Sequence, residues 1–200
     1  MKNRRLSREF FARDSRAVAS ELIGKKLVHI INGCRVSGLI VETEAYIGPQ
    51  DRACHASRGK TKRTAVMFGP PGIWYVYMIY GFYFCLNVVT GEEGHPAAVL
   101  IRALAPMEGI NKMQILRQTD AHQKLASGPG KLCQALGIDK SFNETPATGS
   151  ASQLFVEDSG LNVNPKEIVR TRRIGVDYAG SWAKRLLRFY LKENINVSKL

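Results

Sequence analysis

The sequence has no long hydrophobic run. No stretch approaches the ~20 consecutive apolar residues that a membrane-spanning helix needs. The most apolar stretch, Gly72 to Val89, is interrupted by Gly81 and Asn87, which is more typical of paired strands. The charged first ten residues are not followed by the apolar segment of a secretory signal. We therefore expect an intracellular protein, in the cytoplasm or nucleoid if the source is bacterial, without a membrane partner.

Cysteine is scarce, and its spacing excludes the common frameworks for zinc and disulfides. Cys34, Cys54, Cys85 and Cys133 form no CxxC pair, and no His lies at a zinc-finger distance from them. Free thiols in a reducing compartment are the simplest interpretation. The sequence also lacks a P-loop, a GxGxxG, a GxSxG and the acidic cluster of a two-metal nuclease. We expect no metal and no cofactor.

Basic residues are missing from one long stretch, although the whole chain is strongly basic. No Lys or Arg occurs between Thr64 and Ile101, whereas the net charge of the protein is +12. A domain of this charge commonly binds a polyanion. Aromatic side chains in the uncharged stretch could stack on bases, and the basic segments on either side could bind backbone phosphates. The alternative is that the stretch simply forms the core of the sheet, and it does contain core residues.

The spacing of apolar and turn residues predicts an α+β fold. We expect a single domain over residues 1–200, in which a mostly antiparallel, curved β-sheet is flanked by helices. A helix capped by Ser15 should end at Gly24, and Asn32-Gly33 should join two strands. The predicted strands are Lys26–Ile31, Arg35–Tyr46, Trp74–Ile79, Phe82–Val89, Ala97–Leu104, Arg170–Val176 and Arg188–Leu191; the later helices are Met107–Arg117 and Lys131–Leu136, and residues 50–64 should form a surface loop. A monomer is our expectation.

Two carboxylates lie within Val41-Glu-Thr-Glu-Ala-Tyr46. Strand alternation places Glu42, Glu44 and Tyr46 on one face. Spacing alone favours an exposed face, because two buried carboxylates repel each other and lose hydration. The functional alternative is a carboxylate beside an aromatic ring, where it activates water or stabilises positive charge on a sugar.

Three further residues are unusual for their positions. Tyr80 precedes Gly81 at a predicted hairpin tip, where it either caps the hairpin or pushes between base pairs. Asn87 and Arg102 each interrupt an apolar strand, so each needs a polar partner or faces a pocket. Glu44 is the obvious candidate to pair with Arg102.

Taken in order, these segments resemble the alkyladenine (3-methyladenine, or methylpurine) DNA glycosylases. No single segment is decisive, but their joint order is specific and covers nearly the whole chain. The chain departs from the family pattern at Thr61-Lys-Arg-Thr64 and at Cys54. The matching segments are Val41–Tyr46, His55-Ala56, Arg58-Gly59, Met67-Phe68, Tyr75–Tyr77, Tyr80-Gly81, Cys85–Asn87, Leu100–Leu104, Gly128–Leu136, Arg173–Gly175 and Leu187–Tyr190.

The resemblance implies a base-excision repair enzyme that extrudes a damaged purine from duplex DNA and hydrolyses its N-glycosidic bond. It implies that Glu44 is the general base and that Arg102 and the Ile174 carbonyl hold the attacking water. Tyr80 would fill the gap in the duplex. Tyr46, His55 and Tyr77 would line the base pocket, the His55 amide would contact the purine edge, and Asn87 would clash with the 2-amino group of guanine. Met67 and Lys131 would contact the DNA backbone.

Two other functions remain compatible with the residues. A single-stranded nucleic-acid-binding module would use the aromatic sheet for stacking and would not need Glu44. A glycosidase acting on nucleosides or sugars would not need the basic surface. No Lys occupies a position at which this family uses an amine nucleophile, so we expect hydrolysis without strand cleavage.

Overall fold

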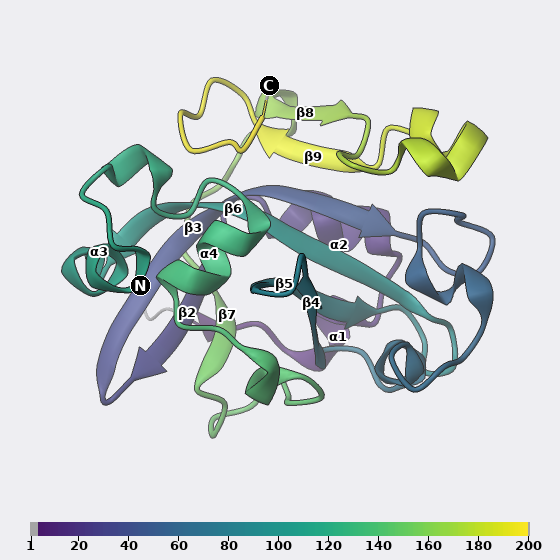
Figure 1. The fold of residues 1–200 in the computed structure, drawn as a ribbon, viewed down its shortest axis with the longest axis horizontal. Coiled ribbons are helices and arrows are strands. Elements are labelled where there is room, and N and C mark those ends of the chain that lie inside the picture. The colour runs from purple at the N-terminus through teal and green to yellow at the C-terminus, as the bar shows by residue number, and fades with distance from the viewer. Residues whose placement is uncertain (1–3, 200) are drawn as a thin grey trace.

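The fold is built on one antiparallel sheet, and the computed structural model describes residues 4–199. Within these residues, nine strands pair along the path β1-β7-β2-β3-β6-β5-β4, and β9 and β8 branch from β3 (Figure 1). The strands are β1 (Arg4–Arg5), β2 (Lys26–Ile31), β3 (Cys34–Tyr46), β4 (Trp74–Ile79), β5 (Tyr83–Thr90), β6 (Ala97–Glu108), β7 (Leu154–Asp158), β8 (Ile168–Thr171) and β9 (Arg188–Leu191). The predicted α+β class is confirmed.

Short helices surround the sheet. The α-helices are α1 (Arg8–Phe11), α2 (Ser15–Leu22), α3 (Ile110–Arg117) and α4 (Pro129–Ala135). The 3-10 helices are η1 (His55–Arg58), η2 (Ala65–Phe68), η3 (His122–Lys124), η4 (Lys140–Phe142), η5 (Pro165–Glu167) and η6 (Asp177–Lys184). Helix α2 packs against β3 and β6, whereas α4 packs against β5 and β6 (Figure 1). No helix within residues 4–199 is long and apolar enough to cross a membrane.

Several element boundaries differ from the predicted ones for identifiable reasons. The side chain of Asp14, not Ser15, caps α2 by accepting a hydrogen bond from the Arg16 amide at 2.8 Å. Helix α3 begins at Ile110 because β6 extends to Glu108 and Gly109 then turns with a φ of 71°. Strand β7, which pairs with β2, was not predicted.

The segment predicted as a strand over Arg170–Val176 is a strand only up to Thr171. The chain leaves the sheet at Arg173, whose guanidinium is held by the Ala45 carbonyl and by Asp51. The Asn32-Gly33 turn is confirmed, with φ values of 51° and 78°. Strands β2, β4 and β9 have the predicted bounds.

Strand β3 changes its partner halfway along one edge. Its first half pairs with β2, and its second half pairs with β9 through Glu42, Thr43 and Glu44. The opposite edge pairs with β6, with register shifts on both sides of Glu42. A bulge of this kind re-aims side chains and is common beside active sites. It brings the acidic end of β3 between β6 and the late strand β9.

The segment from residue 50 to residue 64 is not the freely exposed loop that its polarity predicts. Asp51, Ala53, Cys54 and Ala56 are all buried, and η1 forms within the segment. Its basic residues lie on the outside, whereas the small and acidic ones hold it against the end of the sheet.

Candidate active site

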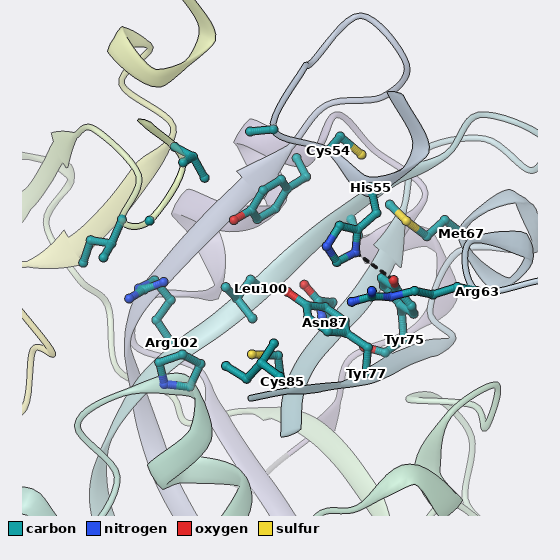
Figure 2. Close-up of a pocket in the computed structure, with 18 of the residues that line it drawn as sticks. Cys54, His55, Arg63, Met67, Tyr75, Tyr77, Cys85, Asn87, Leu100 and Arg102 are labelled. Carbon is teal, nitrogen blue, oxygen red and sulfur yellow. Dashed lines mark hydrogen bonds between the residues drawn. The ribbon is translucent and has the colours of Figure 1, made fainter. Parts of the chain in front are cut away.

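A pocket of about 330 Å³ opens where β3, β4, β5 and β6 meet the η1 segment, a volume within the range of small-ligand sites. Figure 2 shows side chains from these elements converging on it. Aromatic and aliphatic side chains make up most of its lining, with one amide, two cysteines and two arginines among them: Tyr46, Ala53, Cys54, His55, Arg63, Met67, Tyr75, Tyr77, Ile79, Tyr80, Cys85, Asn87, Ala98, Leu100, Arg102, Pro129, Ile174, Gly175, Val176 and Tyr178.

The Glu44 carboxylate lies directly behind the pocket wall and has no solvent-exposed surface. Glu44 Oε1 accepts a hydrogen bond from the Ile174 amide at 2.8 Å, and Arg102 Nη1 lies 3.3 Å from the same oxygen. Glu44 Oε2 accepts from the Tyr46 hydroxyl at 2.9 Å. A carboxylate anion makes all three contacts favourably. The predicted proximity of Glu44 and Arg102 is confirmed, and the burial shows that the interpretation of this face as exposed was wrong.

Arg102 joins two carboxylates at the pocket edge. Burial alone would lower the pKa of its guanidinium, but the neighbouring Glu44 and Glu42 raise that pKa above its ordinary value. Arg102 is therefore cationic at neutral pH, and it lines the pocket beside Glu44.

Aromatic rings form one wall of the pocket. The His55 and Tyr77 rings are 4.7 Å apart and nearly perpendicular, and Tyr75 lies 5.1 Å from Tyr77. His55 Nδ1 is 2.8 Å from the Tyr75 hydroxyl (Figure 2). Burial, helped by the Arg63 and Arg58 cations, lowers the pKa of His55 to about 4, so this imidazole is neutral at pH 7. A wall of uncharged aromatic rings suits stacking on a flat base.

Tyr46 closes the pocket from the end of β3, and its hydroxyl remains protonated. Burial raises the pKa of Tyr46 well above its ordinary value, and the negative Glu44 adds to this effect. Burial also raises the pKa of Tyr77 well above its ordinary value. Both hydroxyls are therefore protonated at neutral pH and can donate hydrogen bonds.

Asn87 and two cysteines complete the polar part of the lining. Asn87 Nδ2 donates to the Tyr75 carbonyl at 3.1 Å, across the β4–β5 pair, which fixes the amide orientation. Burial raises the pKa of Cys54 and of Cys85 to about 11, so both are neutral thiols. Cys133 is buried in the main hydrophobic core, outside the lining of this pocket.

The three remaining predicted residues occupy different surroundings. Tyr80 is 83% exposed at the β4–β5 hairpin tip and has a φ of 52°. Met67 is only 2% exposed and packs in the pocket wall, which leaves little surface for the contact with the DNA backbone that we expected. Lys131 lies in the first turn of α4, next to the pocket residue Pro129.

Sequence analysis missed three residues that shape the site. Glu42 is fully buried and contacts Arg102. Asp51 and Arg173 form a buried ion pair, and the Arg173 guanidinium lies 4.7 Å from the Tyr46 ring centre. A signal existed for Arg173, because it lies within a segment that matched the family. Among residues 4–199, no three His, Cys, Asp or Glu side chains gather as a metal site requires.

This combination of a buried, hydrogen-bonded carboxylate and an aromatic pocket that Arg63 and Arg102 also line, on a basic domain, is typical of enzymes that act on an extruded base. The model of the family described as Methylpurine-DNA glycosylase (MPG) matches residues 9–195. The chain belongs to this family of DNA glycosylases, which are hydrolases that process alkylated bases.

Curated relatives are similar over almost their full length. One from Methanocella arvoryzae, named "Putative 3-methyladenine DNA glycosylase", is 52% identical over 195 residues, which cover 97% of this chain and 96% of the relative. A relative of the same name from Clostridium perfringens is 47% identical over 204 residues, covering 98% and 99%. One from Clostridium botulinum is 47% identical over 203 residues, covering 97% and 98%. The family favours an enzyme over a simple nucleic-acid-binding module.

Proposed function

We propose that the protein extrudes damaged purines from duplex DNA and hydrolyses the N-glycosidic bond with a water that Glu44 activates. The observation that carries this proposal is the position of Glu44, which is buried behind an aromatic pocket and held by Arg102, Tyr46 and the Ile174 amide. The substrates would be alkylated adenine or guanine, the class to which 3-methyladenine in the relatives' names belongs. Hypoxanthine and ethenoadenine are further candidates.

The proposed reaction breaks the bond between sugar C1′ and the base nitrogen, and the electron pair leaves with the base. The sugar becomes oxocarbenium-like, so a negative carboxylate near it lowers the barrier. Water attacks C1′ through its oxygen, and Glu44 takes the proton. The products are an abasic site and the free base: a cationic N-alkylated purine leaves as the neutral base, whereas neutral hypoxanthine or ethenoadenine must gain one proton as it leaves. Since Glu44 has no exposed surface, we place the attacking water at the edge where Arg102 and Ile174 line the pocket.

The remaining residues would select and hold the nucleotide. Tyr46, His55 and Tyr77 would stack on the base, and the hydrogen bond from Asn87 to Tyr75 would fix the amide that clashes with the 2-amino group of guanine. The Ile174 amide contacts Glu44, whereas its carbonyl was the group expected to hold the water. Tyr80 would enter the duplex, and Lys131 would contact a phosphate.

The test is a single-turnover assay on duplex oligonucleotides with one hypoxanthine, one ethenoadenine or one 3-methyladenine, with native protein and Glu44→Gln. We expect an abasic product from the native protein. We expect a loss of about two to three orders of magnitude in Glu44→Gln, because the general base and its charge are removed together. Unchanged activity in this variant would refute the role of Glu44. Binding without product on all three duplexes would refute the proposed reaction.

A further inference from the structure

Glu42 is a second buried carboxylate, two residues before Glu44, for which the proposed chemistry has no role. It has no exposed surface. Glu42 Oε1 accepts hydrogen bonds from Arg102 Nε at 3.2 Å and from Arg188 Nη1 at 2.8 Å. Glu42 Oε2 accepts from the Ser198 amide at 2.8 Å. All three of these contacts are hydrogen bonds, and two of them come from the guanidinium groups of Arg102 and Arg188.

Arg102 is shared between the two carboxylates through different nitrogens. Its Nε faces Glu42, and its Nη1 faces Glu44. A guanidinium is planar and rigid, so fixing Nε in place also fixes the direction of Nη1. The positions of Glu42 and Arg102 thus determine how the cation meets Glu44.

The C-terminal part of the chain completes this network. Arg188, on β9, bridges Glu42 and the Lys199 carbonyl, with Nη1 2.8 Å from each acceptor. The network contains two carboxylates and two guanidiniums, so the buried charges balance. A buried ion network of this kind contributes little net stability compared with an apolar core, which leaves its geometry as a reason for its presence.

We propose that Glu42 is a positioning residue, which orients the Arg102 guanidinium so that Glu44 keeps both its place and its basicity. This inference rests on the proposed role of Glu44. Without the Glu42 charge, Arg102 would turn towards Glu44 and neutralise it more completely. The Ser198 amide donates to the other oxygen of Glu42. A segment more than 150 positions away in sequence therefore helps to fix the orientation of Arg102.

The first test is Glu42→Gln in the single-turnover assay on a hypoxanthine duplex. Glutamine keeps the shape, loses the charge and presents an amide NH2 to a donor. We expect the rate of base release to fall about 10- to 100-fold, since small misplacements of reacting groups have effects of that size. The dissociation constant for the duplex should change by less than about threefold. Glu42→Asp, which restores the charge on a shorter side chain, should recover part of the rate. A native rate in Glu42→Gln would overturn the proposal.

The second test separates positioning from general structural damage. Glu42→Gln is combined with Arg102→Ala, and the four rates are compared. If Glu42 acts through Arg102, its loss should cost little once Arg102 is gone, which makes the two effects strongly non-additive. An equal fold-loss in both backgrounds would mean that Glu42 acts only by supporting the fold.

The third test leaves the Glu42 side chain itself unchanged and remains valid if Glu42→Gln fails to fold. Ser198→Pro removes the amide hydrogen that Glu42 accepts, whereas Ser198→Ala keeps it. We expect the proline variant to be about two- to fivefold slower than the alanine variant, within the range of coupling energies between linked residues. Equal rates would overturn the contribution of this segment.

Glu44→Gln is measured as a control in each of these experiments. It distinguishes a failure of the proposed role of Glu44 from a failure of the proposed role of Glu42. An active Glu44→Gln would refute the proposed function of Glu44 itself. An inactive Glu44→Gln beside a fully active Glu42→Gln would refute only the role of Glu42.

Discussion

Asp51 and Arg173 form an ion pair with no exposed side-chain surface, although they lie 122 positions apart in the sequence. Arg173 Nη2 donates to Asp51 Oδ1 at 2.8 Å, and the Arg173 Nη1 group donates to the Ala45 carbonyl at 3.0 Å. The pair joins the η1 segment, the end of β3 and the chain at Ile174. Three walls of the pocket therefore depend on one buried contact.

Breaking this pair should destabilise the protein strongly. Asp51→Asn leaves the Arg173 cation buried without a carboxylate, which costs about 3–5 kcal/mol of unfolding free energy. Urea denaturation measures the difference. Glu21→Gln is the matched control, because it breaks a half-exposed pair with Arg13 and should cost less than about 1 kcal/mol. Equal losses in the two variants would contradict the prediction.

The stability of the protein should fall in mildly acidic solution because of His55. Its pKa is about 4 in the folded state against an ordinary 6.5, so between these values the unfolded chain binds a proton that the folded protein does not. The contribution is fully present above pH 6.5 and is lost as the pH falls to about 4, with an amplitude of about 2–3 kcal/mol.

Unfolding free energies at pH 7 and pH 4.5 for native protein and His55→Gln isolate this effect. The variant should lose less stability on acidification than the native protein. Because every other side chain is the same in both proteins, the remaining contributions to the pH dependence cancel in the comparison. An identical loss would show that His55 is not responsible.

Tyr80 should matter for DNA binding and hardly at all for folding. Its ring is 83% exposed, so Tyr80→Ala should change the unfolding free energy by less than about 0.5 kcal/mol. Losing one stacked ring should weaken binding to a lesion-containing duplex roughly 5- to 100-fold. Fluorescence anisotropy measures the binding. Ile115→Ala removes another exposed apolar side chain, 70% exposed on α3, and should bind the duplex as the native protein does.

Local patterns in the sequence were sufficient to predict much of the sheet and one central contact of the site. Alternation and the Asn-Gly turn located β2 and β4, and an arginine in an apolar strand pointed to Glu44 as the partner of Arg102. Each of these inferences depends on residues that are close in sequence or on the need of a buried charge for a partner.

The missed features depend on partners that are distant in sequence. The burial of Glu42 needs Arg188 and the Ser198 amide. Arg188 lies within the matching segment Leu187–Tyr190, but no local pattern pairs either group with Glu42. The polar composition of the segment after residue 50 predicts an exposed loop. In the structure Asp51 anchors this segment through its ion pair with Arg173. Hydrophobic periodicity indicates which face of a strand can be buried, but it cannot identify the distant charges that make burial of an acid favourable.

The change of partner along β3, from β2 to β9, has a consequence for biosynthesis. A ribosome completes Glu42 and Glu44 early, whereas Ile174, Arg188 and Ser198 emerge more than a hundred residues later. At 5–20 residues per second, the acidic strand waits roughly 7–30 s for the groups that enclose it. The nascent chain therefore holds the second half of β3 unpaired along one edge, and the site forms only after Ile174, Arg188 and Ser198 have been synthesised.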